Sequence, residues 1–186
     1  MTEELSKFEI KSVGIIQVPN DFHWVNWMME FIETHHIKTH FDIPETIVAK
    51  EPTHYVFAGD KIKVNVVRQT AENATTWNRF TYLREKNSLL LGTLGAALAL
   101  EFLFDELPAG MDIYSFDYPN NLRKKIRDDS REEAKSKFPP TPERLLPKIY
   151  KGVCETPFFY FEEPVFRGES VWNKESMFFH FDYVKS

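Results

Sequence analysis

An apolar run at residues 89–104, LLLGTLGAALALEFLF, most constrains how this chain can fold. A helix over this run is apolar on nearly every side, so none of its faces can remain in water. The run contains Glu101 and is shorter than the roughly 20 residues that a membrane span requires. We therefore expect a buried central helix over residues 89–106, with Ser88 as its cap.

Small residues recur along one face of this expected helix. Gly92, Gly95 and Ala99 follow one another at spacings of three and four residues, which places them on the same side. We expect this smooth stripe to let a sheet or another helix approach closely.

The N-terminal half of the chain predicts strands around one further helix. Residues 7–18 are β-prone and predict a first strand, and apolar side chains at helical spacing predict an amphipathic helix over residues 21–36. Residues 55–66 predict a hairpin with its turn at Ala58-Gly59-Asp60. Residues 79–84 alternate in side-chain type and predict another strand.

The C-terminal half predicts a strand over residues 111–118 and then a highly charged helix over residues 120–137. A short helix is expected over residues 142–150. Two aromatic runs, FFYF at residues 158–161 and MFFHFDYV at residues 177–184, predict strands that form a long hairpin.

These elements predict an α+β fold, with an antiparallel or mixed sheet packed by the central and the N-terminal helix and with the charged helix outside. A chain of 186 residues fits a single domain, residues 1–186. The Pro-rich stretch at residues 139–147 is the one expected internal boundary, before a C-terminal β-hairpin subregion at residues 150–186.

Composition favours a cytoplasmic protein with no membrane partner. Cys154 is the only cysteine, so no intrachain disulfide can form. The N-terminus lacks a basic segment followed by a long apolar run, the pattern of a secretory signal. The net charge of −5 does not indicate the excess of basic residues that is typical of nucleic-acid binding proteins.

The stretch HHIKTHFD at residues 35–42 is the candidate metal site. Glu33, His36 and His40 share one face of a slightly extended helix, and Asp42 or His54 would complete a divalent-cation site. Under this alternative the chain is a metal-dependent hydrolase, with phosphoesters as a candidate substrate class. The favoured interpretation is a plain helix end, where histidines suit the helix dipole, with no cofactor.

The charged segment suggests a weaker alternative, an RNA or single-strand nucleic-acid binder. Arg123, Lys124 and Arg127 would contact phosphates. Acidic side chains lie four residues from several of the basic ones, so a solvated face with internal ion pairs is the commoner meaning of such a segment.

Aromatic residues are abundant, with 17 Phe, 7 Tyr and 4 Trp. A strand that is apolar on both faces must be covered on both, by helices of the same chain or by a partner. We expect a protein partner or self-association through a surface made by Phe158, Tyr160, Phe179, Phe181 and Tyr183. The leading hypothesis is therefore a non-enzymatic interaction factor of the inhibitor, immunity or assembly type.

Overall fold

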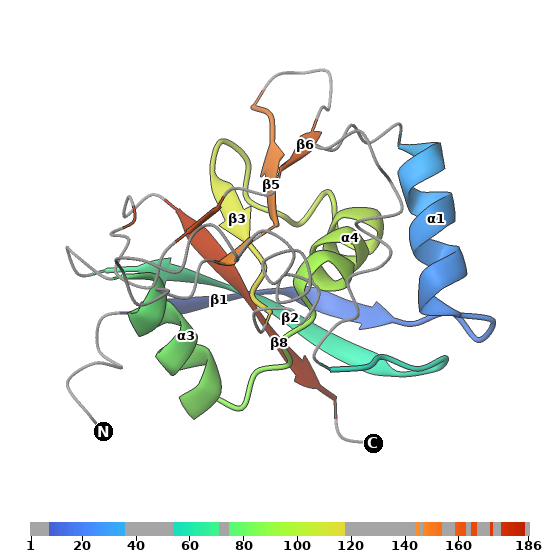
Figure 1. The fold of residues 1–186 in the computed structure, drawn as a ribbon, viewed down its shortest axis with the longest axis horizontal. Helices are drawn as coiled ribbons and strands as arrows, with labels where there is room; N and C mark the ends of the chain where they lie inside the picture. Colours follow the sequence, from blue (N-terminus) through green and yellow to red (C-terminus); the bar gives the residue numbers. More distant parts are fainter. Residues whose placement is uncertain are drawn as a thin grey trace, which may run out of the picture.

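The structure is a computed structural model that describes residues 8–35, 54–70, 75–117, 144–145, 147–153, 159–162, 165–166, 172 and 176–184. Figure 1 shows the arrangement of its helices and strands. The described elements follow one another along the chain as β1 (Phe8–Gln17), α1 (Trp24–Thr34), β2 (Lys61–Gln69), α3 (Thr76–Glu85), α4 (Gly92–Phe102), β3 (Asp112–Tyr114), β4 (Arg144–Leu145), β5 (Lys148–Lys151), β6 (Phe159–Glu162), β7 (Val165–Phe166) and β8 (Met177–Tyr183).

The main sheet is mixed and has the strand order β1-β2-β8-β3-β5-β6. Strand β3 runs parallel to β8, whereas the other neighbouring pairs are antiparallel. Strands β4 and β7 pair separately with each other. The expected α+β class with a mixed sheet is therefore confirmed.

Each face of the sheet carries its own hydrophobic cluster. Along β8, Phe179 and Phe181 pack in the cluster that includes residues of α1 and α4, whereas Phe178 packs in the cluster that includes residues of α3. This alternation follows from the two-residue period of a strand. Figure 1 accordingly shows α3 apart from α1 and α4. Helices of the same chain thus cover both faces of β8.

Helix α4 approaches the sheet closely. Its residues from Gly92 to Leu100 are all buried. A Cβ atom added to Gly95 would lie 2.7 Å from the Cε2 atom of Phe181 on β8, a separation that real side chains do not tolerate. Glycine at this position therefore permits the helix to lie against the strand.

Residues 79–84, predicted as a strand, instead belong to helix α3, so that prediction was wrong. Thr75 and Asn78 form a capping box, in which each side chain bonds the backbone N–H of the other residue. The buried side chains then recur at the helical spacing of Thr76, Arg79, Phe80 and Leu83. The capping box and the helical spacing of the buried residues therefore favour a helix more strongly than the short alternation of side-chain types favours a strand.

The expected hairpin over residues 55–66 is also wrong. The turn forms, with the Asp60 N–H donating to the Phe57 carbonyl at 3.1 Å, but the residues before it are not a strand. Strand β2 pairs with β1 and β8 instead. Its apolar side chains are buried on both faces, which requires a central place in the sheet.

The C-terminal region differs from expectation in two ways. Residues 142–150, predicted as a helix, include strands β4 and β5, with Pro147 between them, and a proline disfavours helix at the residue before it. The two aromatic runs form strands β6 and β8 but do not pair with each other: β6 pairs with β5, and β8 lies between β2 and β3. The expected hairpin is therefore wrong. The charged helix at residues 120–137 and the boundary at residues 139–147 lie outside the described residues.

Candidate functional site

An exposed aromatic patch joins the end of β8 to the segment that precedes β2. We define it as Tyr55, Phe57 and Tyr183, whose surfaces are 41%, 64% and 45% exposed. The Tyr183 hydroxyl donates a hydrogen bond to the Tyr55 carbonyl oxygen at 2.7 Å. Burial raises the pKa of Tyr183, and the negative charge of Asp60 raises it further, so Tyr183 remains a hydrogen-bond donor at neutral pH.

The segment that carries the patch is held by a tight turn. The Phe57 N–H donates to Oδ2 of Asp60 at 2.8 Å. Gly59 has a φ of 83°, a conformation that side chains rarely adopt, and its carbonyl accepts a hydrogen bond from Gln17 Nε2 at 2.9 Å. Val56 is buried in the core. These contacts order the patch in the absence of a partner, which lowers the entropic cost of binding.

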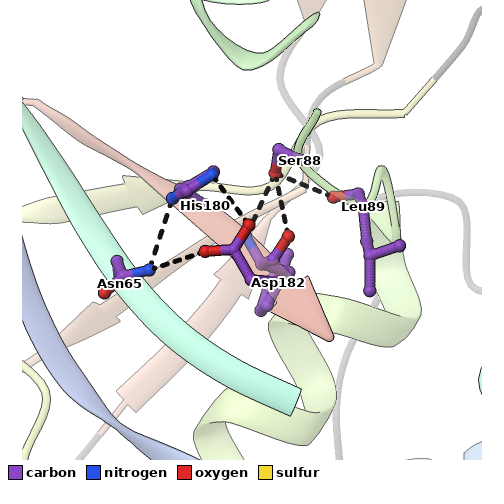
Figure 2. A network of polar contacts seen from close by, with 6 residues as sticks. Asn65, Ser88, Leu89, His180 and Asp182 are labelled. Carbon is purple, nitrogen blue, oxygen red and sulfur yellow. Dashed lines mark hydrogen bonds and ion pairs between the residues drawn. The ribbon is translucent and has the colours of Figure 1, made fainter. Parts of the chain in front are cut away.

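A polar cluster of Asn65, His180 and Asp182 lies where β2 pairs with β8 (Figure 2). It is on the α3 face of the sheet, the face that α3 covers. His180 is buried, and its Nδ1 atom lies 3.3 Å from Nδ2 of Asn65. An amide nitrogen can only donate, so Nδ1 accepts and the neutral imidazole carries its proton on Nε2. That Nε2 atom lies 3.3 Å from Oδ1 of Asp182 without hydrogen-bond geometry, so this contact would become an ion pair only if the imidazole were protonated.

The environment of the polar cluster keeps His180 neutral. Burial lowers the pKa of His180 below its ordinary value of 6.5, and the neighbouring Asp182 carboxylate opposes that shift. The positive charges of Lys86 and Lys63 lower the pKa further, while a contact with the Lys86 backbone raises it. A neutral imidazole beside a carboxylate can accept a proton, which is the chemistry that this cluster offers.

Ser88 borders the polar cluster but does not complete a catalytic arrangement. Its hydroxyl accepts a hydrogen bond from the Phe181 N–H at 3.1 Å and donates to the Leu89 carbonyl at 3.1 Å (Figure 2). Ser88 therefore ties the segment before α4 to β8. The expected cap was wrong, because Leu91 is the N-cap of α4 and makes no side-chain bond. Among the described residues no hydroxyl or thiol bonds to His180.

A buried arginine lies further along the α3 face. Arg79 is fully buried, donates hydrogen bonds to Oε1 of Gln69 and to the Ser176 carbonyl, and stacks 4.1 Å from the centre of the Trp172 ring. Burial lowers its pKa to about 9, and Tyr114 partly opposes the shift. No carboxylate forms an ion pair with Arg79 within the described ranges. Carbonyl oxygens and aromatic rings thus solvate this cation.

The candidate metal site falls largely outside the part of the chain that the structure describes. Glu33 belongs to α1, whereas His36, His40 and Asp42 lie outside the described residues. His54 accepts a hydrogen bond from the Leu90 N–H at its Nδ1 atom, at 2.9 Å. Among the residues with a described position, no three potential metal ligands form a group. Metal binding, and the hydrolase that depends on it, stay predictions.

The predicted nucleic-acid contacts Arg123, Lys124 and Arg127 also lie outside the described residues, so this hypothesis stays a prediction. At the start of the cluster HHIKTHFD, Nε2 of His35 lies 2.6 Å from Oε2 of Glu101. This contact links the end of α1 to α4.

The residues predicted for a partner surface have different environments. Phe158 lies outside the described residues, and Tyr160 is described only by its backbone pairing with Tyr150 in the sheet. Phe179 and Phe181 are 1% and 2% exposed, because α4 and its neighbours cover them. The structure therefore places these two rings in the core rather than on a surface. Tyr183 is exposed and belongs to the aromatic patch.

Sequence reasoning missed two members of the aromatic patch, and it missed the whole polar cluster. Tyr55 and Phe57 were assigned to a strand, although Phe57 directly precedes a turn, where chain segments usually lie at the surface. His180 could have been noticed as a polar residue inside the apolar run of β8, because a buried polar side chain requires a partner. Asn65 alternates with Lys61 and Lys63 in β2 and carries no such signal. Their pairing across two strands, however, has no local signal.

Among the helices that the structure describes, none combines the length and the apolar composition that a membrane span requires.

Comparison with known proteins found no relative. The chain matches no protein-family model, no curated protein and no solved structure.

Proposed function

We propose that this protein is a non-enzymatic interaction factor, of the inhibitor, immunity or assembly type, that binds a protein partner through the aromatic patch. The observation that carries the proposal is the exposure of three aromatic residues on a segment that hydrogen bonds hold to the sheet. Aromatic side chains are enriched in protein interfaces, and tyrosine and tryptophan dominate their binding energy.

The chemistry of the patch suggests what its partner offers. The rings present apolar surface, Asp60 acts electrostatically on Tyr183, and Lys61, which follows Asp60 in the chain, is exposed. Such a surface resembles the apolar centre and polar rim of an interface. We expect the partner to place apolar side chains against the rings and polar groups against the rim.

The polar cluster supports the non-enzymatic part of the proposal. His180 and Asp182 are suited to proton transfer, but the hydroxyl of Ser88, which borders the polar cluster, is committed to the backbone of Leu89 and Phe181. A histidine without a nucleophile or substrate group in reach is more typical of a structural network.

The experiment compares partner capture by the wild-type protein and two variants. Phe57→Ser removes a patch ring, and Trp77→Ser removes another exposed aromatic side chain, 49% exposed on α3, as the matched control. A partner identified by affinity capture is then titrated calorimetrically with each protein. Loss of a central interface aromatic costs about 2 kcal/mol, so we expect roughly 30-fold weaker binding for Phe57→Ser alone.

Two results would contradict the proposal. One is a partner that binds Phe57→Ser as tightly as the wild-type protein. The other is equal weakening by Trp77→Ser, which would indicate a general loss of apolar surface. Because Phe57 is mostly exposed, Phe57→Ser should unfold at the temperature of the wild-type protein, and a thermal scan of both variants checks that each is folded at the temperature of the titration.

A further inference from the structure

Among the residues that the structure describes, no strand pairs with the outer edge of β1. Strand β1 stands at the end of the strand order, and β2 is its only described neighbour in the sheet. Ile10 and Ile15 on β1 are 44% and 57% exposed. Within the described ranges, no backbone hydrogen bond links the outer edge of β1 to another segment. A long open edge of this kind is a template for another strand.

Two features limit which part of this edge can pair. A bulge between Ser12 and Gly14 interrupts the register of β1 with β2, and bulges twist an edge strand away from regular pairing. Lys11 is exposed, and an edge lysine opposes pairing unless a carboxylate lies opposite it. The stretch from Phe8 to Ser12 is therefore the pairable part, and its partner must offer a negative charge near Lys11.

We propose that β1 pairs antiparallel with β1 of a second copy of this chain, about a two-fold axis at Ile10. In this register Ile10 faces its own counterpart, Phe8 faces Ser12, and Glu9 of each copy faces Lys11 of the other. Opposite charges on directly opposed residues stabilise antiparallel strands, and two such pairs form. The exposed Ile10 side chains also leave water together.

The charge pattern selects this register over its neighbours. A two-fold axis at Glu9 would place two carboxylates opposite each other, and an axis at Lys11 would oppose two ammonium groups, which destabilises strand pairing. An axis at Ile10 alone among these three gives complementary charges. A symmetric interface of this type is the commonest arrangement in homodimers.

This dimer uses a different surface from the proposed function. Gln17, at the far end of β1, contacts the turn that orders the aromatic patch, whereas pairing is confined to the stretch from Phe8 to Ser12. Each copy would therefore keep its own patch accessible. Failure of the dimer and failure of partner binding can consequently be told apart.

Charge exchange provides the test, with the full chain studied by sedimentation over a concentration series. Glu9→Lys and Lys11→Glu each create like-charge pairs and should weaken the dimer at least about tenfold. The double variant Glu9→Lys/Lys11→Glu should restore it, and so should an equimolar mixture of the two single variants. Glu85→Lys, an equal charge change at an exposed position on α3, should have no effect.

A cross-linking experiment tests the register itself, in a Cys154→Ser background. Directly opposed residues have Cα atoms about 4.5–5.5 Å apart, within the range of a disulfide, so Ile10→Cys should form a disulfide-linked dimer on oxidation. Ser12→Cys is the control, because the two Ser12 positions would lie about 13 Å apart.

Several outcomes would overturn the proposal. One is that the wild-type chain stays monomeric at millimolar concentration. Another is that both single charge variants dimerise as tightly as the wild-type protein. A third is that Ile10→Cys cross-links no better than Ser12→Cys. A dimer that the mixture of single variants fails to restore would likewise exclude the Glu9–Lys11 pairing.

Discussion

Acidification is expected to weaken the fold through His180. In the folded protein burial lowers the pKa of His180, whereas in the unfolded chain it returns to about 6.5. Between these two pKa values the unfolded chain binds a proton that the folded protein excludes. Stability from this residue is therefore fully present above pH 6.5 and decreases as the pH falls toward the folded pKa.

The magnitude follows from linkage. One excluded proton changes the free energy of unfolding by about 1.4 kcal/mol for each pH unit within that window. With a urea m-value of about 2 kcal/mol/M, the midpoint of unfolding moves by roughly 0.7 M per pH unit. Asp182 narrows the pH range between the folded and unfolded pKa values of His180, because its carboxylate favours the protonated imidazole. The positive charges of Lys86 and Lys63 disfavour that form and widen the range.

The assay is urea unfolding followed by circular dichroism from about pH 7.5 to 5.5, for the wild-type protein and for His180→Asn. Other groups titrate in both proteins, so the difference between them isolates His180. We expect the stability advantage of the wild-type protein to shrink below pH 6.5, with a slope that reaches at most about 1.4 kcal/mol per unit. In Asp182→Asn the decline should extend to lower pH. A wild-type advantage that stays constant across this range would refute the reasoning.

Two further predictions concern α3. Arg79→Lys should lower the free energy of unfolding by about 2 kcal/mol, because an ammonium group cannot both donate to the Gln69 and Ser176 oxygens and stack on Trp172. Denaturant unfolding measures this change, and an unchanged midpoint would contradict the prediction. Thr75→Ala removes the cap that bonds the Asn78 N–H at 3.2 Å and should cost about 1 kcal/mol in the same assay. Thr75→Ser, which keeps the hydroxyl, is its control and should stay near the wild-type value.

Local sequence patterns are sufficient to predict several elements of the fold. The β-prone run forms β1, and the apolar residues at helical spacing form α1. The run starting at Leu89 contains α4, and its Gly95 marks the closest approach to β8. These features depend on periods of two or 3.6 residues, which a sequence displays directly.

Long-range pairing was decided only by the tertiary structure. Strand β8 lies between β2 and β3, far from either in sequence, because its apolar side chains on both faces require a central place in the sheet. The same pairing brings His180 beside Asn65. The hydrogen bond from Tyr183 to the Tyr55 carbonyl, which completes the aromatic patch, spans a similar separation.

The sequence by itself thus determined where several strands and helices can start. Only the tertiary structure decided which segments become neighbours, and hence that Phe179 and Phe181 lie in the core while Tyr183 lies in the aromatic patch. The physical reason is that periodicity is a property of consecutive residues, whereas burial depends on what the whole chain places on each face of a strand.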